Sequence, residues 1–313
     1  MRYVLGRIGQ AVLVLFAAFT AAFLLLQAMP GDAIMIKFEN PELGLSREQI
    51  DALRQSYGAD IPLPAQYWHA LTGFLGGDFG TSIQSGTPVR QLIAAVFPNT
   101  LLLAGLGFVV AALLAGAIAL AASLPGLTRI GDWLRALPSL FVAVPVFWLG
   151  IVLIQVFSFQ LRLVPVVNPG PIEGLILPVL TLAVPISAPL AQILIRSIDE
   201  VRGLPFAAVV RARGASPWWL LSRNVARNAV LPTLTMAGVL FGELIGGAVV
   251  TETVFGRAGI GRITEQAVTN QDTPVLLAVV IVSATAFVLI NLIVDLLYPV
   301  LDPRLARPKA SRS

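Results

Sequence analysis

The chain has 313 residues, of which 57% are apolar and 12% charged, whereas a soluble globular protein has about 45–50% and 25%. These proportions nearly exclude a soluble domain, because so much apolar surface needs lipid as its solvent. There is no cysteine, so disulfides, thiolate metal sites and cysteine nucleophiles are excluded together. The net charge of +4 fits either nucleic acid or a membrane as partner, and the placement of the charges decides between them.

Six stretches are long and apolar enough to cross a bilayer, since about 20 helical residues cover its hydrocarbon core. Only Glu243 and Asp295 place charges inside them. The first stretch is too long for a signal peptide and is followed by no small-residue cleavage site, so we expect it to remain as a span. The expected spans are Gly9–Met29, Phe97–Ala122, Leu137–Phe159, Gly174–Ile195, Ala229–Val250 and Pro274–Leu297.

The basic residues predict the orientation of these spans. The N-terminus, segments 123–136 and 196–228 and the C-terminal tail together hold 14 Arg or Lys, whereas the two short segments on the other side hold three. Short loops rich in Arg and Lys stay in the cytoplasm. We therefore expect both termini in the cytoplasm and the long segment 30–96 outside.

The outer segment 30–96 is expected to form a small helical cap on the membrane. Ser46-Arg47-Glu48-Gln49 has the spacing of a capping box and opens a short helix that Gly58 ends. A second amphipathic stretch runs from Pro62 to Phe74, and Thr87-Pro88 opens a third that continues into the second span.

Small residues at four-residue intervals predict close packing between the spans, because they let helix backbones approach one another. They are Gly238, Gly242 and Gly246 in the fifth span and Gly107, Ala111 and Ala115 in the second. Prolines in the third and fourth spans, Pro145 among them, remove backbone donors and favour kinks.

No pattern for catalysis or metal binding is found. Neither Lys37 nor Lys309 follows a glycine-rich turn, which excludes an ATP-binding P-loop. The glycine-rich stretch 256–262 has no strand before it, so a tight turn is expected there rather than a dinucleotide site. His69 is the only histidine and has no second ligand at helical spacing. We expect no catalytic residue and no metal in this chain.

Segment 196–228 has the pattern helix, turn, helix. Pro205 opens a helix that runs to Arg213, Gly214 breaks it, and Ser216-Pro217 start a second helix. Three interpretations are open: an interfacial element with arginines toward lipid phosphates, a DNA-reading pair, or a docking knob for a partner protein. Attachment to the membrane on both sides disfavours DNA.

This loop resembles the conserved cytoplasmic loop of permease subunits of binding-protein-dependent ABC importers, in the version of the dipeptide, oligopeptide and nickel branch. The resemblance rests on Arg211-Ala212-Arg213-Gly214-Ala215, followed eighteen residues after the glycine by Leu231-Pro232. Nearly the whole chain takes part, through stretches in the order 66–82, 145–150, 242–255, 259–262 and 291–304. Ala208-Val209-Val210 departs from the family's Glu-Ala-Ala, so no salt bridge of that acid is carried over.

The resemblance implies an all-α integral membrane protein of six transmembrane helices, with the type I ABC importer permease fold over residues 1–313. It implies a bacterial inner membrane location and a complex without nucleic acid. The partners are a second homologous permease, two ATPase subunits that bind ATP and Mg, and an extracytoplasmic substrate-binding protein. The cargo is a short peptide or a related small solute such as nickel.

In that setting the loop is a coupling helix that docks into an ATPase subunit. The docking residues are Arg211, Ala212, Arg213, Gly214, Ala215 and Ser216. We expect Gly214 to adopt a backbone conformation with no room for a Cβ atom, and Ala215 to pack against the partner.

Glu243 is the leading candidate for the translocation pathway, and Glu252 and Asp295 are two further candidates. It lies about 21 Å along its helix from Ala229, where an ionised carboxylate costs about 3 kcal/mol unless it is solvated or paired. Two interpretations of Glu243 would supply this stabilisation. Its carboxylate forms a structural ion pair, or it lies in the wall of a water-filled translocation cavity that attracts cationic groups. A secondary transporter or channel without ATPases is the alternative function, although two acids within the spans are few for a coupling path.

The orientation can be tested with single cysteines, because the native chain has none. We expect Ser85→Cys to react with a membrane-impermeant maleimide in intact cells, and Ser311→Cys to react only after lysis. The opposite labelling pattern would reverse the orientation and place segment 196–228 outside.

Overall fold

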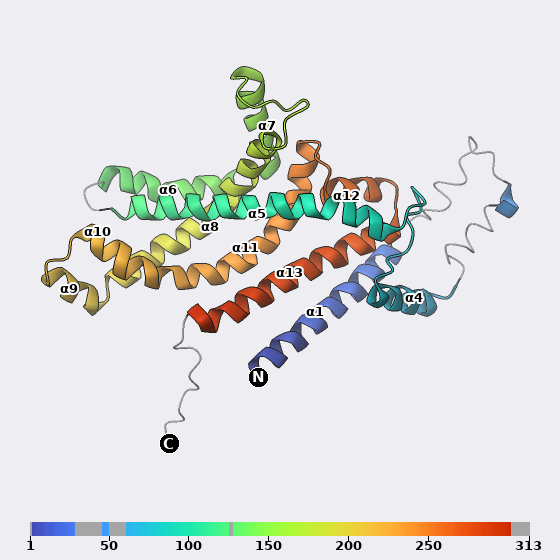
Figure 1. The fold of residues 1–313 in the computed structure, drawn as a ribbon, viewed down its shortest axis with the longest axis horizontal. Helices are drawn as coiled ribbons and strands as arrows, with labels where there is room; N and C mark the ends of the chain where they lie inside the picture. The colour runs from blue at the N-terminus through green and yellow to red at the C-terminus, as the bar shows by residue number, and fades with distance from the viewer. Residues whose placement is uncertain (1, 29–45, 50–60, 125–127, 302–313) are drawn as a thin grey trace. The chain divides into compact units, whose positions relative to one another are not determined.

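The computed structural model describes residues 2–28, 46–49, 61–124 and 128–301 (Figure 1). Within them the chain is helical, and the single bridge between extended residues pairs Thr81 with Pro88. The helices are α1 Arg2–Gln27, α4 Leu63–Gly76, α5 Val89–Ala122, α6 Thr128–Ala143, α7 Val146–Leu153, α8 Glu173–Arg202, α9 Pro205–Ala212, α10 Pro217–Trp219, α11 Ala226–Val254, α12 Ile260–Thr269 and α13 Thr273–Leu301. Two π-helical segments, Ile154–Gln160 and Leu220–Val225, follow α7 and α10. The all-α expectation is confirmed for this part of the chain.

The chain forms two compact units. The first consists of Met1–Thr100 and Gly256–Leu289, and so holds α1, α4, the start of α5, α12 and most of α13. The second consists of Leu101–Phe255 and Ile290–Ser313, and holds the rest of α5 together with α6 to α11.

Five of the six expected spans are single helices that are long and apolar enough to cross a membrane, namely α1, α5, α8, α11 and α13. The third expected span, Leu137–Phe159, is bent as its prolines predicted, because Ile130–Ala143 and Val146–Gln160 meet at an angle of 103°. Pro145 causes the break: it has no N–H to continue the helix and holds an extended conformation (φ −62°, ψ 136°) before α7. Pro138, in contrast, lies inside α6 without ending it.

The helices of the second unit pack closely at small residues of α5. A Cβ atom on Gly107 would lie 3.3 Å from Cβ of Leu182 in α8, and Ala111 and Ala115 are buried. The predicted close packing of the second span is thus confirmed. In α11 the close approach falls at Gly247, whose Cβ would lie 3.3 Å from Cδ2 of Leu182.

The glycine pattern expected in the fifth span is only partly used within the second unit. Gly238 is buried and Gly242 half-buried, but Gly246 is exposed, and no described atom lies within 4 Å of where its Cβ would stand. Gly247 takes the place of Gly246 because the register of α11 turns that neighbouring residue toward α8.

In the first unit, α4 packs on α1 through aromatic rings. Tyr67 lies edge-on to Phe19 and Phe23, with ring centroids 5.6 and 5.4 Å apart, and its hydroxyl is 2.8 Å from Oγ1 of Thr20. Phe74 lies edge-on to Phe19 at 5.4 Å. The amphipathic helix predicted from Pro62 to Phe74 is confirmed.

The predicted capping box at Ser46 is also present. The Ser46 amide donates to Oε1 of Gln49 at 2.8 Å, and the Gln49 amide donates to Oγ of Ser46 at 3.3 Å. The rest of the helix predicted up to Gly58 lies outside the described residues.

A buried carboxylate fastens two distant segments of the first unit. Asp272 is 3% exposed, and its carboxylate accepts hydrogen bonds from Oγ of Ser82 (2.5 Å) and from the amides of Ile83 (3.3 Å) and Gln84 (3.2 Å). Its carbonyl accepts from the Leu276 amide at 3.0 Å, where α13 begins. The turn before α5 is therefore tied to the first turn of α13.

Replacement of this carboxylate should destabilise the chain. Asp272→Ala leaves buried donors without acceptors and is expected to cost about 3 kcal/mol, measured as a lower thermal unfolding midpoint in detergent. Glu265→Ala on the exposed side of α12 is the matched control and should unfold like the wild type. Equal midpoints for the two variants would contradict a structural role of Asp272.

Candidate functional site

The segment from α9 to α11 forms the predicted helix, turn, helix (Figure 1). Leu204 is extended and Pro205 occupies the first turn of α9, where its missing N–H leaves no hydrogen bond unmade. The amide of Gly214 donates to the carbonyl of Arg211 at 3.0 Å and closes the helix. Oγ of Ser216 accepts from the Trp219 amide at 3.2 Å and caps α10, which continues through the π-helical segment into α11.

Gly214 is required by its backbone conformation. Its φ of +87° lies in the left-handed region, which side chains with a Cβ atom rarely adopt. This φ agrees with the expectation of a backbone conformation that disfavours a Cβ atom. Beyond Gly214 and its two chain neighbours, no described atom lies within 4 Å of where the Cβ would stand, so the constraint comes from the local backbone rather than from packing.

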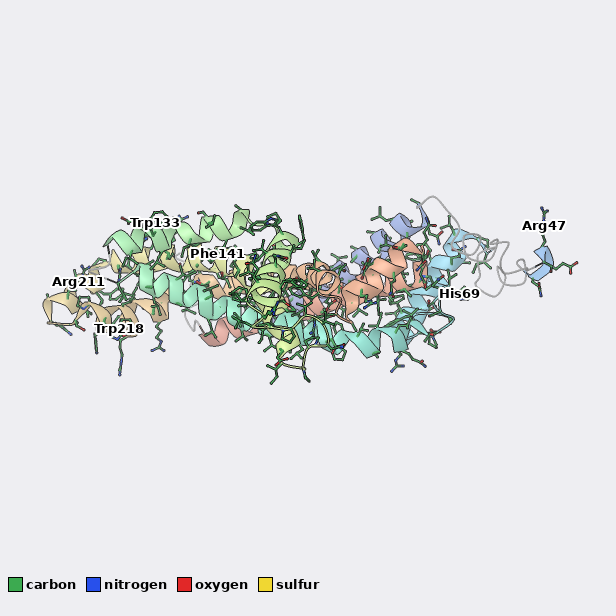
Figure 2. The ribbon with its side chains drawn as sticks, turned by 90° about the horizontal axis from the view of Figure 1, so that it is seen from above. Arg47, His69, Trp133, Phe141, Arg211 and Trp218 are labelled. Carbon is green, nitrogen blue, oxygen red and sulfur yellow. The ribbon has the colours of Figure 1, made fainter. Side chains whose placement is uncertain are left out.

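One face of this segment belongs to the core of the second unit. Ala207, Leu221 and Val225 are fully buried and form one cluster with side chains of α5 and α8. The other face is exposed and carries Arg213 and Trp218, and Figure 2 labels the second of them. The exposed face therefore has a fixed shape, because the opposite face of the segment packs against α5 and α8.

Of the predicted docking residues, Arg211 is engaged within the chain. Its guanidinium donates to the carbonyls of Ala207 (3.4 Å) and Arg202 (3.3 Å). Arg202 in turn donates to the carbonyl of Ser123 at 2.5 Å. Ala212, Arg213, Gly214 and Ser216 are exposed, whereas Ala215 is half-buried against its own chain.

An ion pair next to the loop was not foreseen from the sequence. Arg135 on α6 and Asp199 on α8 form a bidentate pair, with N–O distances of 2.6 and 3.1 Å. The two residues are 64 positions apart, so no local spacing could have revealed the pair.

The structure separates the pathway candidates. Glu243 is exposed on α11, whereas Glu252 is 1% exposed near the end of the same helix. Nine residues separate them, which is about 13 Å along a helix. Asp295 lies on α13. A common pathway for these acids stays a prediction.

Metal ligands do not gather in the described residues. No group of three or more His, Asp or Glu side chains lies close enough there to hold an ion. His69 is exposed on α4 (Figure 2).

Nearly the whole chain matches one family of transport proteins. Residues 114–307 match the family described as binding-protein-dependent transport system inner membrane component. Residues 1–104 match the N-terminal region of the membrane components of these systems.

Curated relatives are permeases. The glutathione transport system permease protein GsiC of Salmonella typhimurium strain LT2 is 36% identical over 304 residues, which cover 97% of this chain and 98% of that protein. GsiC of Escherichia coli strain K12 is 34% identical over 311 residues, with the same coverage.

A solved structure shares the fold. A chain of the MetNI methionine ABC transporter in an inward-facing conformation superposes with a TM-score of 0.57 and 16% identity, covering 67% of this chain and 96% of that chain. The chain described here therefore belongs to the binding-protein-dependent transport family and is a permease component of an ABC importer.

Proposed function

We propose that this permease forms half of a translocation pathway for short peptides or peptide-like solutes, and that residues 211–216 couple it to a cytoplasmic ATPase subunit. The observation that carries the coupling role is the Gly214 turn, a fixed and exposed shape between two helices that are anchored in the core. ATP and Mg would be bound by the partner subunits, since the chain has no P-loop of its own.

The loop connects two membrane-crossing helices and could pass a movement of its exposed face to both of them. It joins the C-terminal end of α8 directly to α11, and both are membrane-crossing helices by length and composition. The buried Leu220, Leu221 and Val225 attach the segment to the helix core. A displacement of the exposed face would therefore move the ends of both helices as rigid bodies, which is how packed helices pass a change between distant sites.

The proposed cargo follows from the relatives and from charge. The curated relatives are named for glutathione transport. Glutathione is a small peptide with one ammonium group and two carboxylates, and only its ammonium group would be attracted to a negative wall. Glu243 keeps an exposed carboxylate within the apolar part of α11, where water or a partner must solvate it. A water-filled pathway supplies that solvation, and its negative charge would favour the amino group of a peptide or a metal ion.

The proposed orientation places the loop on the ATPase side. The excess of arginine and lysine in the segments on that side supports cytoplasmic termini in a bacterial inner membrane. The remaining proposed partners are a homologous permease and an extracytoplasmic binding protein, which would select the cargo before this chain passes it.

A substitution at the turn should uncouple transport. Gly214→Val forces a branched side chain into a left-handed conformation at a cost of about 1–2 kcal/mol or more, so we expect transport into proteoliposomes to fall about tenfold. Gly203→Val is the matched control, since Gly203 is also exposed but has a φ of −76° that any residue tolerates.

A second variant tests docking by size. Ala215→Arg adds a long cation to the surface next to the turn, and we expect it to reduce both transport and copurification of ATPase subunits while membrane insertion is preserved. Wild-type transport by both Gly214→Val and Ala215→Arg would leave the loop as a membrane-surface element without a coupling role.

A further inference from the structure

A cavity with several charged side chains in its wall lies in the second unit, beside the loop. Its volume is about 550 Å³, and it opens where the end of α5, the start of α6, the end of α8 and α9–α10 meet. Three arginines line it, Arg135, Arg202 and Arg211, together with Ser123 and Asp132. The proposed coupling role leaves this cavity without a function.

The chain neutralises the positive charge of the cavity only in part. Asp199 pairs with Arg135, but the guanidinium groups of Arg202 and Arg211 donate to backbone carbonyls. In the described part of the chain neither Arg202 nor Arg211 forms an ion pair. An anion in the cavity would supply charge-assisted hydrogen bonds to both.

A buried hydroxyl in the cavity lacks a partner. Ser123 is 3% exposed and lines the cavity, and its Oγ has no hydrogen-bond partner among the described residues. Buried polar atoms in native proteins are nearly always paired, so an orphaned hydroxyl points to a group that binds there. The Oγ atom is covered in this structure, so a rotation of the Ser123 side chain would bring its hydroxyl to an anion that the two arginines also bind.

The surroundings place the cavity at the depth of lipid headgroups. Along α8 the apolar stretch ends at Ile195, and Arg202 lies about 10 Å farther along the helix, within the headgroup layer beside the hydrocarbon core. The tryptophans near it are exposed, Trp133 at 77% and Trp218 at 56% (Figure 2). Exposed tryptophans are typical of this interfacial layer.

We propose that this cavity binds the phosphodiester group of a membrane phospholipid. Arg202, Arg211 and Ser123 would donate to the phosphate oxygens. Asp132 is the one carboxylate that lines the cavity, and its negative charge offsets part of the charge of the arginines. The remaining positive charge suits a ligand with a single negative charge better than a polyphosphate. Because Arg211 belongs to the loop, a bound phosphate would link the loop to the ends of α5 and α8.

The test measures lipid binding to the full chain purified with its native partners. The complex is stripped of lipid in detergent and titrated with dioleoyl phosphatidylglycerol, and bound lipids are counted by native mass spectrometry. We expect Arg202→Gln and Ser123→Ala to weaken one binding event about tenfold. Arg196→Gln is the matched control and should bind as the wild type, since Arg196 is exposed on α8 and pairs with Glu200 outside the cavity.

Ser123→Ala separates binding from folding. Without lipid it removes an unpaired buried hydroxyl, so its thermal stability should equal or exceed that of the wild type. Weaker lipid binding by a variant of unchanged stability can only reflect a lost contact to the ligand.

The same titration with inorganic phosphate distinguishes the source of the phosphate group. Phosphate that binds the wild type but not Arg202→Gln, with no specific lipid retained, would support the phosphate site and assign it to a soluble ligand. Lipid binding that is equal in the wild type, Arg202→Gln and Ser123→Ala would overturn the proposal. So would loss of ATPase subunits from Arg202→Gln at unchanged lipid binding, which would show that a partner carboxylate fills the cavity.

Discussion

The hydrocarbon core of a bilayer offers no hydrogen-bond partners, and this constraint governs where the chain can stop being helical. Within the apolar stretches the backbone stays helical, with the exception of the 103° bend before α7, where Pro145 has no amide to satisfy. The sharp reversals fall at polar positions and are closed by hydrogen bonds, at Gly214 by the Arg211 carbonyl and at Asp272 by the turn before α5. The proposed coupling surface accordingly lies at the helix ends.

The same end of the second unit holds both the proposed coupling surface and the arginine-lined cavity. Arg211 belongs to both, since it lies at the end of α9 and lines the cavity. A partner that docks on the exposed surface of the loop and a phosphate that binds in the cavity would thus both act on the Arg211 side chain. Lipid binding at the cavity would then bear directly on the coupling step.

Local signals predicted the helices, and long-range contacts account for what was missed. Hydropathy identified the spans and Gly214 the turn, since both depend on neighbouring residues alone. The length of α8 was underestimated because its last turns, from Arg196 to Arg202, are charged. The angle of the bend between α6 and α7 could not be predicted, because α7 packs against the end of α11 through Gly150 and Val254, which are far apart in the sequence. The Ser82–Asp272 contact joins residues 190 positions apart, so no local pattern could reveal it.

The proposed function depends on coupling of this permease to separate ATPases through the α9–α10 segment. This coupling is tested by the subunit composition of the tagged chain, extracted in a mild detergent and weighed intact by native mass spectrometry. We expect a complex of this chain, a related permease and two nucleotide-binding subunits. A chain that is recovered alone or as a homo-oligomer, while it still transports its solute, would rule out this coupling.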